Sequence, residues 1–138
     1  MQRNHILLVE DNLADVELVK ITLRDIETPV NIVILRDGEE LLEYLRTHSL
    51  REIGLVLLDL NMPRLNGFEV LAALREHEQW SLLPAIVFST STSVGDIRKS
   101  YELGAKAYVA KPLDITDYNF SIMAIIRFWL RVNIVPDI

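Results

Sequence analysis

Residues 6–12 read Ile6-Leu7-Leu8-Val9-Glu10-Asp11-Asn12. An apolar run this short, rich in Leu, Ile and Val, is typical of a strand buried on both faces of a parallel sheet. Two carboxylates follow it directly, at the point where such a strand ends. The same arrangement of a short apolar run followed by polar residues returns at residues 30–35, 55–58, 85–88 and 107–110.

Segments with helical spacing of their apolar residues separate these runs. They cover residues 15–24, 38–46, 67–76, 95–103 and 115–131, and Gly104 stands where a glycine commonly closes a helix. This strict alternation of strand-like and helix-like segments predicts a single α/β domain with a parallel sheet and right-handed crossovers.

The composition narrows the possible functions. The chain has 138 residues, no cysteine, and 14 basic against 20 acidic side chains, which gives a net charge of −6. The length allows one domain, and the lack of cysteine excludes disulfide scaffolds, thiol catalysis and cysteine-bound metals. The acidic balance without a basic patch argues against nucleic acid as a partner. We expect no signal peptide and no transmembrane helix, because no apolar run is long enough, and therefore a cytoplasmic protein with no membrane partner.

Chemically capable side chains follow four of the five apolar runs. Glu10 and Asp11 follow the first, Asp59 the third, Ser89 the fourth and Lys111 the fifth. Open α/β sheets bind ligands at the carboxyl ends of their strands, and a strand order of 2-1-3-4-5 would place the first and third strands side by side. Three carboxylates would then share one crevice, where Mg²⁺ would offset their repulsion. Such a crevice suits phosphoryl transfer to Asp59, with Lys111 and the Ser89 hydroxyl stabilising the phosphoryl oxygens.

Each of these residues also has a simpler explanation. Asp11 or Asn12 could cap the following helix, Ser89 could stabilise a turn, and Lys111-Pro112 could form a surface turn. Their joint occurrence, each at the end of a different apolar run, favours one shared site.

Over roughly residues 5–130, the chain resembles the receiver domain of bacterial two-component response regulators. The motifs that carry the resemblance are Ile6-Leu7-Leu8-Val9-Glu10-Asp11-Asn12, Leu58-Asp59-Leu60-Asn61-Met62-Pro63, Asn66-Gly67, Ser89, Gly104-Ala105 and Tyr108-Val109-Ala110-Lys111-Pro112. The resemblance implies a flavodoxin-like (βα)5 fold, a doubly wound parallel sheet of five strands in the order 2-1-3-4-5. A receiver domain would cover residues 1–127, followed by a C-terminal apolar extension at 128–138.

The resemblance assigns a phosphoacceptor switch rather than an enzyme, with self-phosphotransfer and autodephosphorylation as its only chemistry. Asp59 matches the phosphoacceptor, which receives its phosphoryl group from a histidine kinase. Glu10, Asp11 and Asp59 match the acidic ligands of Mg²⁺ or Mn²⁺. Asn61 matches the residue whose main-chain carbonyl completes the metal site.

The remaining matches concern the switch and the turns around it. Lys111 matches the lysine that contacts the phosphoryl group. Ser89 and Tyr108 match the two switch residues, a hydroxyl that moves to the phosphoryl group and an aromatic ring that turns inward behind it. Pro112 matches a proline that usually follows a cis bond, and Gly67 matches a turn glycine after the metal loop. The switch is expected to reshape the face of the fourth helix, fifth strand and fifth helix for a partner.

Within this family the chain is most similar to the single-domain response regulators paired with bacterial and cyanobacterial phytochromes. The supporting residues are 96–105 and Phe128-Trp129-Leu130. This similarity implies a phytochrome-type, light-sensing sensor histidine kinase as partner and a homodimer through the C-terminal region.

The end of the sequence is apolar and contributes to a mean hydropathy of +0.22 for the chain. An exposed apolar stripe marks an interaction site, so we expect the fifth helix and the tail to cross to a second copy in a two-fold dimer. Phe128, Trp129 and Leu130 would lie in that interface. The alternative is that the apolar tail packs on its own sheet. Since the sequence stops soon after the fifth helix, we expect a stand-alone receiver.

Other functions remain open. The chain could be an intermediate phosphotransfer receiver in a multistep phosphorelay, a Mg²⁺-dependent aspartyl phosphohydrolase, or a binding module without phosphorylation. The hydrolase is disfavoured because such enzymes usually carry a second aspartate two residues after the nucleophile, where this chain has Asn61. The binding module is disfavoured because Asp59, Lys111 and the acidic pair are all present.

Overall fold

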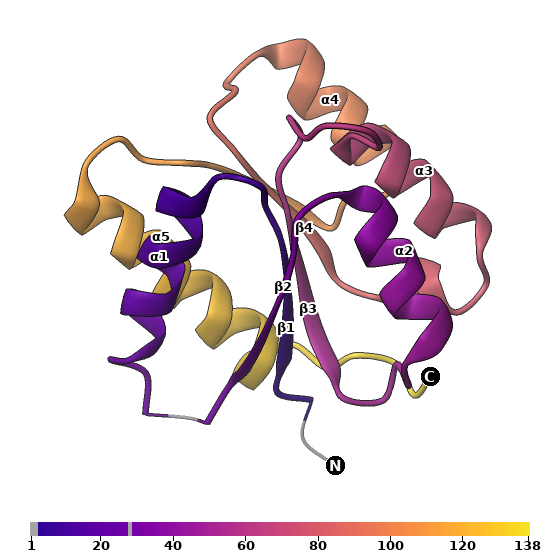
Figure 1. The fold of residues 1–138 in the computed structure, drawn as a ribbon, viewed down its shortest axis with the longest axis horizontal. Coiled ribbons are helices and arrows are strands. Elements are labelled where there is room, and N and C mark those ends of the chain that lie inside the picture. Colours follow the sequence, from indigo (N-terminus) through magenta and orange to yellow (C-terminus); the bar gives the residue numbers. More distant parts are fainter. Residues whose placement is uncertain (1–2, 28) are drawn as a thin grey trace.

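Five parallel strands form the centre of the domain, shown in the ribbon of Figure 1. The computed structural model describes residues 3–27 and 29–138, so Met1, Gln2 and Thr28, which belong to the predicted receiver range 1–127, lie outside the described residues. The strands are β1 (His5–Val9), β2 (Asn31–Leu35), β3 (Ile53–Leu58), β4 (Ala85–Ser89) and β5 (Ala107–Ala110). They pair in the order β2-β1-β3-β4-β5, which confirms the predicted flavodoxin-like topology.

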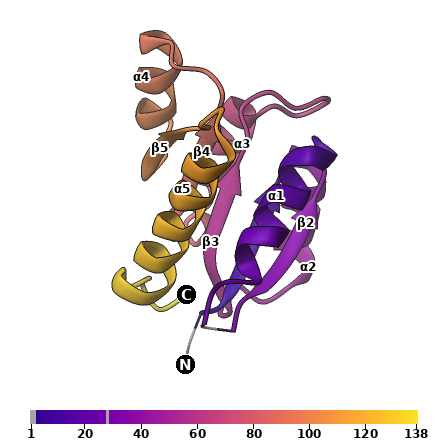
Figure 2. The same ribbon diagram turned by 90° about the vertical axis from the view of Figure 1, so that its left-hand side faces the viewer.

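Two layers of helices enclose the sheet. The helices are α1 (Leu13–Leu23), α2 (Gly38–Thr47), α3 (Gly67–Glu76), α4 (Val94–Glu102) and α5 (Ile115–Arg127). Helices α1 and α5 cover one face, and α2, α3 and α4 cover the other (Figure 1). Figure 2 looks onto the first face, where α1 lies beside α5. A short 3-10 turn, η1 (Trp80–Leu82), precedes β4.

Each α-helix begins at a polar residue whose side chain accepts a hydrogen bond from the first turn. Such a cap satisfies a backbone N–H that the helix itself leaves without an acceptor, so it fixes where the helix starts. The caps are Asn12, Asp37, Asn66, Ser93 and Asp114. Asn12 rather than Asp11 caps α1, which leaves the Asp11 carboxylate free of that role.

The sheet separates two hydrophobic cores. Alternate residues of β1 point to opposite faces: Leu7 and Val9 pack with α2 and α3, while Ile6 and Leu8 pack with α1 and α5. Every residue of β3 is buried, because this strand lies at the centre with helices on both faces. Burial on both sides explains why the strands read as continuous apolar runs.

The fifth helix is shorter than the predicted segment 115–131. Helix α5 ends at Arg127, and a π-helical turn, η2 (Phe128–Val132), follows it. In that turn the backbone N–H of Asn133 donates to the carbonyl of Phe128 at 2.7 Å. The side chain of Leu130 then packs against Gly54 at the start of β3.

The tail folds back onto its own domain. The Arg3 guanidinium donates to the carbonyls of Leu50 at 2.7 Å and Ile53 at 2.9 Å, and also to those of Pro136 at 3.3 Å and Ile138 at 3.4 Å. Of the three residues predicted for a dimer interface, Trp129 and Leu130 are half-buried against the core between the sheet and α1 and α5. These two side chains therefore pack on their own domain, as the alternative to the dimer predicts. Phe128 remains 47% exposed.

None of the helices in the described part of the chain is long and apolar enough to cross a membrane.

Truncation of a core residue in β3 should destabilise the whole domain. Leu57 is 2% exposed and packs in the α1–α5 core, so Leu57→Ala should lower the free energy of unfolding by about 2–5 kcal/mol. Leu113→Ala is the matched control, because Leu113 is 98% exposed and its truncation should stay within about 0.5 kcal/mol. Urea unfolding followed by circular dichroism measures both, and equal losses would contradict the assignment of β3 as the centre of the core.

Candidate functional site

Backbone pairing at the carboxyl edge of the sheet brings the predicted side chains together. The N–H of Asp59 donates to the carbonyl of Val9 at 3.1 Å, which places Asp59 beside Glu10. The N–H of Lys111 donates to the carbonyl of Ser89 at 2.7 Å, which places Lys111 beside the end of β4. The residues therefore meet because parallel strands end at the same edge.

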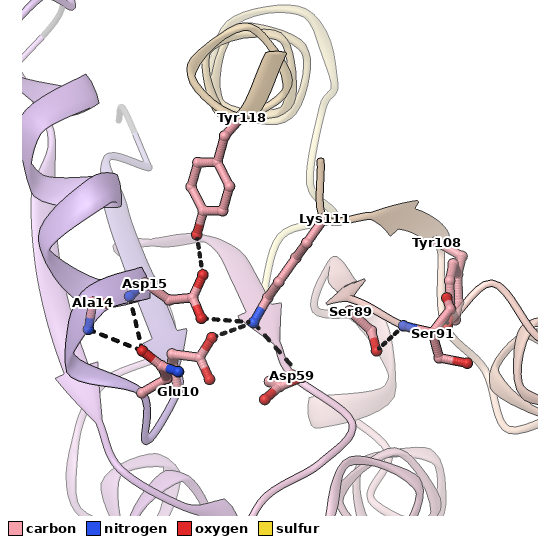
Figure 3. A network of polar contacts seen from close by, with 10 residues as sticks. Glu10, Ala14, Asp15, Asp59, Ser89, Ser91, Tyr108, Lys111 and Tyr118 are labelled. Carbon is pink, nitrogen blue, oxygen red and sulfur yellow. Dashed lines mark hydrogen bonds and ion pairs between the residues drawn. The ribbon is translucent and has the colours of Figure 1, made fainter. Parts of the chain in front are cut away.

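Lys111 lies at the centre of the site (Figure 3). Its Nζ contacts Glu10 Oε1 at 2.5 Å and Asp15 Oδ2 at 3.3 Å, and lies 3.9 Å from Asp59 Oδ1. The Lys111 side chain is only 6% exposed, and those of Glu10 and Asp59 are 4% and 11% exposed. Water screens such charges poorly, so the positions of the carboxylates are tied to the position of the ammonium.

Two members of this network were not predicted. Asp15 stands in the first turn of α1 and accepts a hydrogen bond from the Tyr118 hydroxyl of α5 at 2.8 Å. Asp15 could have been found from its place in the first turn of the helix that follows Glu10 and Asp11. Tyr118 carries no local signal, because only the packing of α5 against α1 brings its hydroxyl to the site.

The acidic cluster fits a hard divalent cation. Glu10, Asp11 and Asp59 each offer a carboxylate oxygen, and these oxygens lie within 4.8 Å of one another. Asp11 is exposed, whereas Glu10 Oε2 is buried and has no hydrogen-bond partner among the described residues. A buried acceptor of this kind needs a ligand, and carboxylate oxygens are those that Mg²⁺ and Mn²⁺ accept. Asn61, the fourth predicted ligand, is exposed two residues beyond Asp59.

The charges at the site perturb each other. Burial raises the pKa of Glu10 to about 8, and the charge of Asp59 adds to this rise, while the hydrogen bond from Lys111 opposes it. Burial acts to lower the pKa of Lys111, but the hydrogen bond and charge of Glu10, with the charges of Asp59 and Asp15, produce a net rise. The neighbouring carboxylates therefore favour the charged form of Lys111, whereas burial favours the neutral form of the Glu10 carboxyl.

The predicted switch residues lie on the other side of Lys111. Ser89 is fully buried, and its Oγ accepts a hydrogen bond from the Ser91 N–H at 3.2 Å. The Tyr108 hydroxyl donates to the carbonyl of Ser91 at 2.7 Å, so the half-buried Tyr108 ring already points toward the loop after β4. Ser91 thus connects Ser89 to Tyr108.

Gly67 has a steric reason to be glycine. A Cβ atom at this position would lie 2.6 Å from the carbonyl oxygen of Asp59 and 2.7 Å from Leu60 Cα, closer than side chains tolerate. Asn66 and Glu69 form a capping box that starts α3 at this point. The helix start therefore packs directly behind the backbone of Asp59.

The expectation of a cis bond before Pro112 is wrong. The Lys111–Pro112 peptide bond is trans in this structure. The trans form is intrinsically preferred by about 0.5–1 kcal/mol even before proline, and with it the Lys111 side chain already reaches Glu10 and Asp59.

A comparison with known protein families identifies the domain. The model for the response regulator receiver domain matches residues 6–121. The chain belongs to the response regulator receiver domain family. The match spans β1 to the middle of α5 and includes every residue discussed above for the acidic cluster and the switch.

Individual relatives are similar in sequence to this receiver domain over nearly its whole length. It is 37% identical to the probable methanogenesis regulatory protein FilR2 of Methanothrix harundinacea over 134 residues, which cover 95% of this chain and 86% of that protein. It is 35% identical to the response regulator Rcp1 of Synechocystis sp. over 135 residues, which cover 95% of this chain and 92% of Rcp1.

Solved structures show the same fold. The phosphorylated cyanobacterial phytochrome response regulator RcpA superposes with a TM-score of 0.90 at 35% identity, over 97% of this chain and 99% of RcpA. The Mn²⁺-bound form of Rcp1 superposes with a TM-score of 0.87 at 34% identity, over 96% of this chain and 99% of Rcp1. The receiver domain is thus related to phytochrome response regulators, which confirms the finer resemblance.

The pKa of Glu10 predicts a pH-dependent stability without metal. This pKa is about 8 in the folded state against 4.5 for an ordinary glutamate, so the folded protein binds a proton that the unfolded chain releases. The stabilising contribution is complete below about pH 4.5 and is lost as the pH rises through about 8. In EDTA, the melting temperature should therefore fall between about pH 4.5 and about pH 8, and Glu10→Gln should flatten that fall. An equal fall in Glu10→Gln, measured by scanning fluorimetry, would assign the pH dependence to another group.

Proposed function

We propose that this receiver domain acts as a response regulator that accepts a phosphoryl group from a sensor histidine kinase on Asp59. The observation that carries the proposal is the buried Lys111 ammonium 3.9 Å from Asp59 Oδ1, beside three carboxylates able to hold a metal ion. A charge this deeply buried is costly without a function or a partner, and phosphoryl oxygens are the ligands that a lysine binds as a point charge.

The transfer is a substitution at phosphorus. An oxygen of Asp59 attacks the phosphohistidine, a P–O bond forms, the P–N bond breaks, and the imidazole nitrogen leaves with the electron pair. Glu10, Asp11, Asp59 and the main-chain carbonyl of Asn61 would hold Mg²⁺ or Mn²⁺. The bound ion would supply positive charge that offsets the negative charge of the phosphoryl oxygens. Lys111 contributes a second positive charge, and its low exposure makes that charge effective.

The switch follows from the new charge. A phosphoryl group on Asp59 would attract the Ser89 hydroxyl, whose present partner is the Ser91 N–H. Ser91 also accepts the hydrogen bond from Tyr108, so a movement of this loop would release or draw in the Tyr108 ring. The surface of α4, β5 and α5 would change with it and present a different face to a partner.

The relatives support a phytochrome-type kinase as partner. RcpA is a cyanobacterial phytochrome response regulator and resembles this chain over 97% of its length. The net charge of −6 supports protein rather than nucleic acid as the partner. We place the protein in the cytoplasm, where such a kinase domain would present its phosphohistidine.

Phosphorylation of Asp59 is directly testable. Beryllofluoride, which mimics the phosphoryl group, should bind in the presence of Mg²⁺, and acetyl phosphate should label Asp59. Asp59→Asn should abolish both, because it removes the nucleophile and one metal ligand. Lys111→Met should weaken beryllofluoride binding by about tenfold or more, since it removes one charge-assisted contact. Fluorine NMR and intact-mass spectrometry measure these outcomes, and labelling that persists in Asp59→Asn would refute the assignment.

We also propose that a homodimer forms through α5 and the tail. Exposed apolar side chains there include Phe120, Phe128, Val132 and Ile134, which are 74%, 47%, 66% and 89% exposed. Phe120 and Phe128 are eight residues apart, about two helical turns, and so share one face of the helix. An exposed stripe of this kind is typical of an interface between copies.

The dimer is tested by sedimentation velocity at about 50 µM, with and without beryllofluoride. The wild type should sediment as a dimer in at least one of these states. Phe128→Ser should weaken association by about tenfold, whereas Leu82→Ser, a control on η1 with a side chain 42% exposed, should not. A monomer in both states would exclude this dimer.

A further inference from the structure

Helices α1 and α5 are joined by two polar bridges. Near the site, the Tyr118 hydroxyl donates to Asp15 Oδ1 at 2.8 Å. Farther from it, the Thr22 hydroxyl contacts Asn119 Oδ1 at 2.6 Å. Tyr118 and Thr22 are 3% and 1% exposed, so both bridges lie in the interior between the helices. The two helices are therefore held in a defined relative position.

Asp15 divides its two oxygens between Lys111 and Tyr118. Oδ2 pairs with the ammonium at 3.3 Å, and Oδ1 accepts the hydrogen bond from Tyr118 (Figure 3). Burial raises the pKa of Tyr118, and the hydrogen bond to Asp15 and its charge add to the rise, so this residue stays a hydrogen-bond donor. A continuous chain of contacts thus runs from the ammonium of Lys111 to the first turns of α5.

The proposed phosphotransfer does not use Asp15. Among the described residues, the cluster of oxygens able to share a metal comprises Glu10, Asp11 and Asp59. Asp15 instead competes for Lys111, because it holds the ammonium on the α1 side while Asp59 lies 3.9 Å away. A phosphoryl group on Asp59 would strengthen the pull from the opposite side and weaken the pair with Asp15.

Tyr118 also contacts the end of β4. Its ring meets that of Phe88 edge to face, with 5.2 Å between centroids, and Phe88 directly precedes the switch residue Ser89. The Tyr118 side chain is therefore confined between Asp15 and β4, and a change in the orientation of Asp15 has to be taken up by the tyrosine or by α5.

We propose that Asp15 and Tyr118 form a second branch of the switch, in which Asp15 positions Lys111 and Tyr118 transmits the loss of the Lys111–Asp15 pair to α5. This inference rests on the proposed phosphorylation of Asp59. The branch is separate from Ser89 and Tyr108, which act through the loop after β4. Its output is the α1–α5 pair and, through α5, the turn η2 that begins the apolar tail.

The test uses amide chemical shifts of the full chain before and after addition of beryllofluoride and Mg²⁺. In the wild type, shifts should change both near Ser91 and Tyr108 and along α5 at Ile122 and Ile126. In Tyr118→Phe, which keeps the ring and removes the hydroxyl, the changes along α5 should fall to about half or less. The changes near Ser91 and Tyr108 should remain, which shows that the variant is folded and binds the mimic.

Two further variants separate positioning from packing. Asp15→Asn keeps an acceptor for Tyr118 but removes the charge that competes for Lys111, so it should tighten beryllofluoride binding by about threefold or more. Tyr44→Phe is the matched control, since Tyr44 is a half-buried tyrosine of α2 on the other face of the sheet, and it should leave the response of α5 unchanged.

The outcomes distinguish the two proposals. A full α5 response in Tyr118→Phe, or unchanged or weaker binding in Asp15→Asn, overturns the second branch and leaves phosphorylation of Asp59 intact. A wild type that shows no beryllofluoride-dependent shifts at all overturns the proposed function, and the second branch with it.

Discussion

The structure depends on one buried ammonium group. Lys111 is 6% exposed and has three carboxylates within 3.9 Å, so its charge is balanced only while the ends of β1, β3 and β5 and the start of α1 stay together. Removing one partner from such a cluster leaves an uncompensated charge in a poorly screened interior. The carboxylates exceed the ammonium in number, which fits a site for a divalent cation.

The fold supplies the rigidity that this cluster needs. A central strand buried on both faces cannot shift by one residue without moving every side chain to the wrong core, so the register of β1 and β3 is firmly set. Glu10 and Asp59 follow directly after these two strands and inherit that precision. Lys111 follows the edge strand β5, which is only half-buried, and it reaches the cluster through a long side chain. The two acids are therefore fixed by the sheet, whereas the Lys111 ammonium is held by its contacts with the carboxylates.

Much of this could be predicted from the sequence, and the failures have physical causes. The strand order and the acidic cluster follow from where apolar runs end, because burial on both faces leaves a strong local pattern. The contact between Asp15 and Tyr118 could not be predicted, since it joins residues 103 positions apart and depends on how α5 packs on α1. The apolar tail predicts an interface with a second copy, and the two hydrogen bonds from Arg3 to the carbonyls of Pro136 and Ile138, which also hold the tail on its own domain, are invisible in a hydropathy pattern. The cis bond at Pro112 came from resemblance alone, and no property of the local sequence required it.

The close approach of Gly67 to the Asp59 carbonyl has a consequence for the direction of movement. With α3 pressed against it from behind, the backbone of Asp59 serves as a fixed reference point in the molecule. A charge added in front of it cannot be accommodated by recoil of β3. Under the proposed phosphorylation, the displacement would go outward, into Lys111, the loop after β4 and the start of α1. If Asp59 is phosphorylated as proposed, the close packing at Gly67 would make the structural response one-sided.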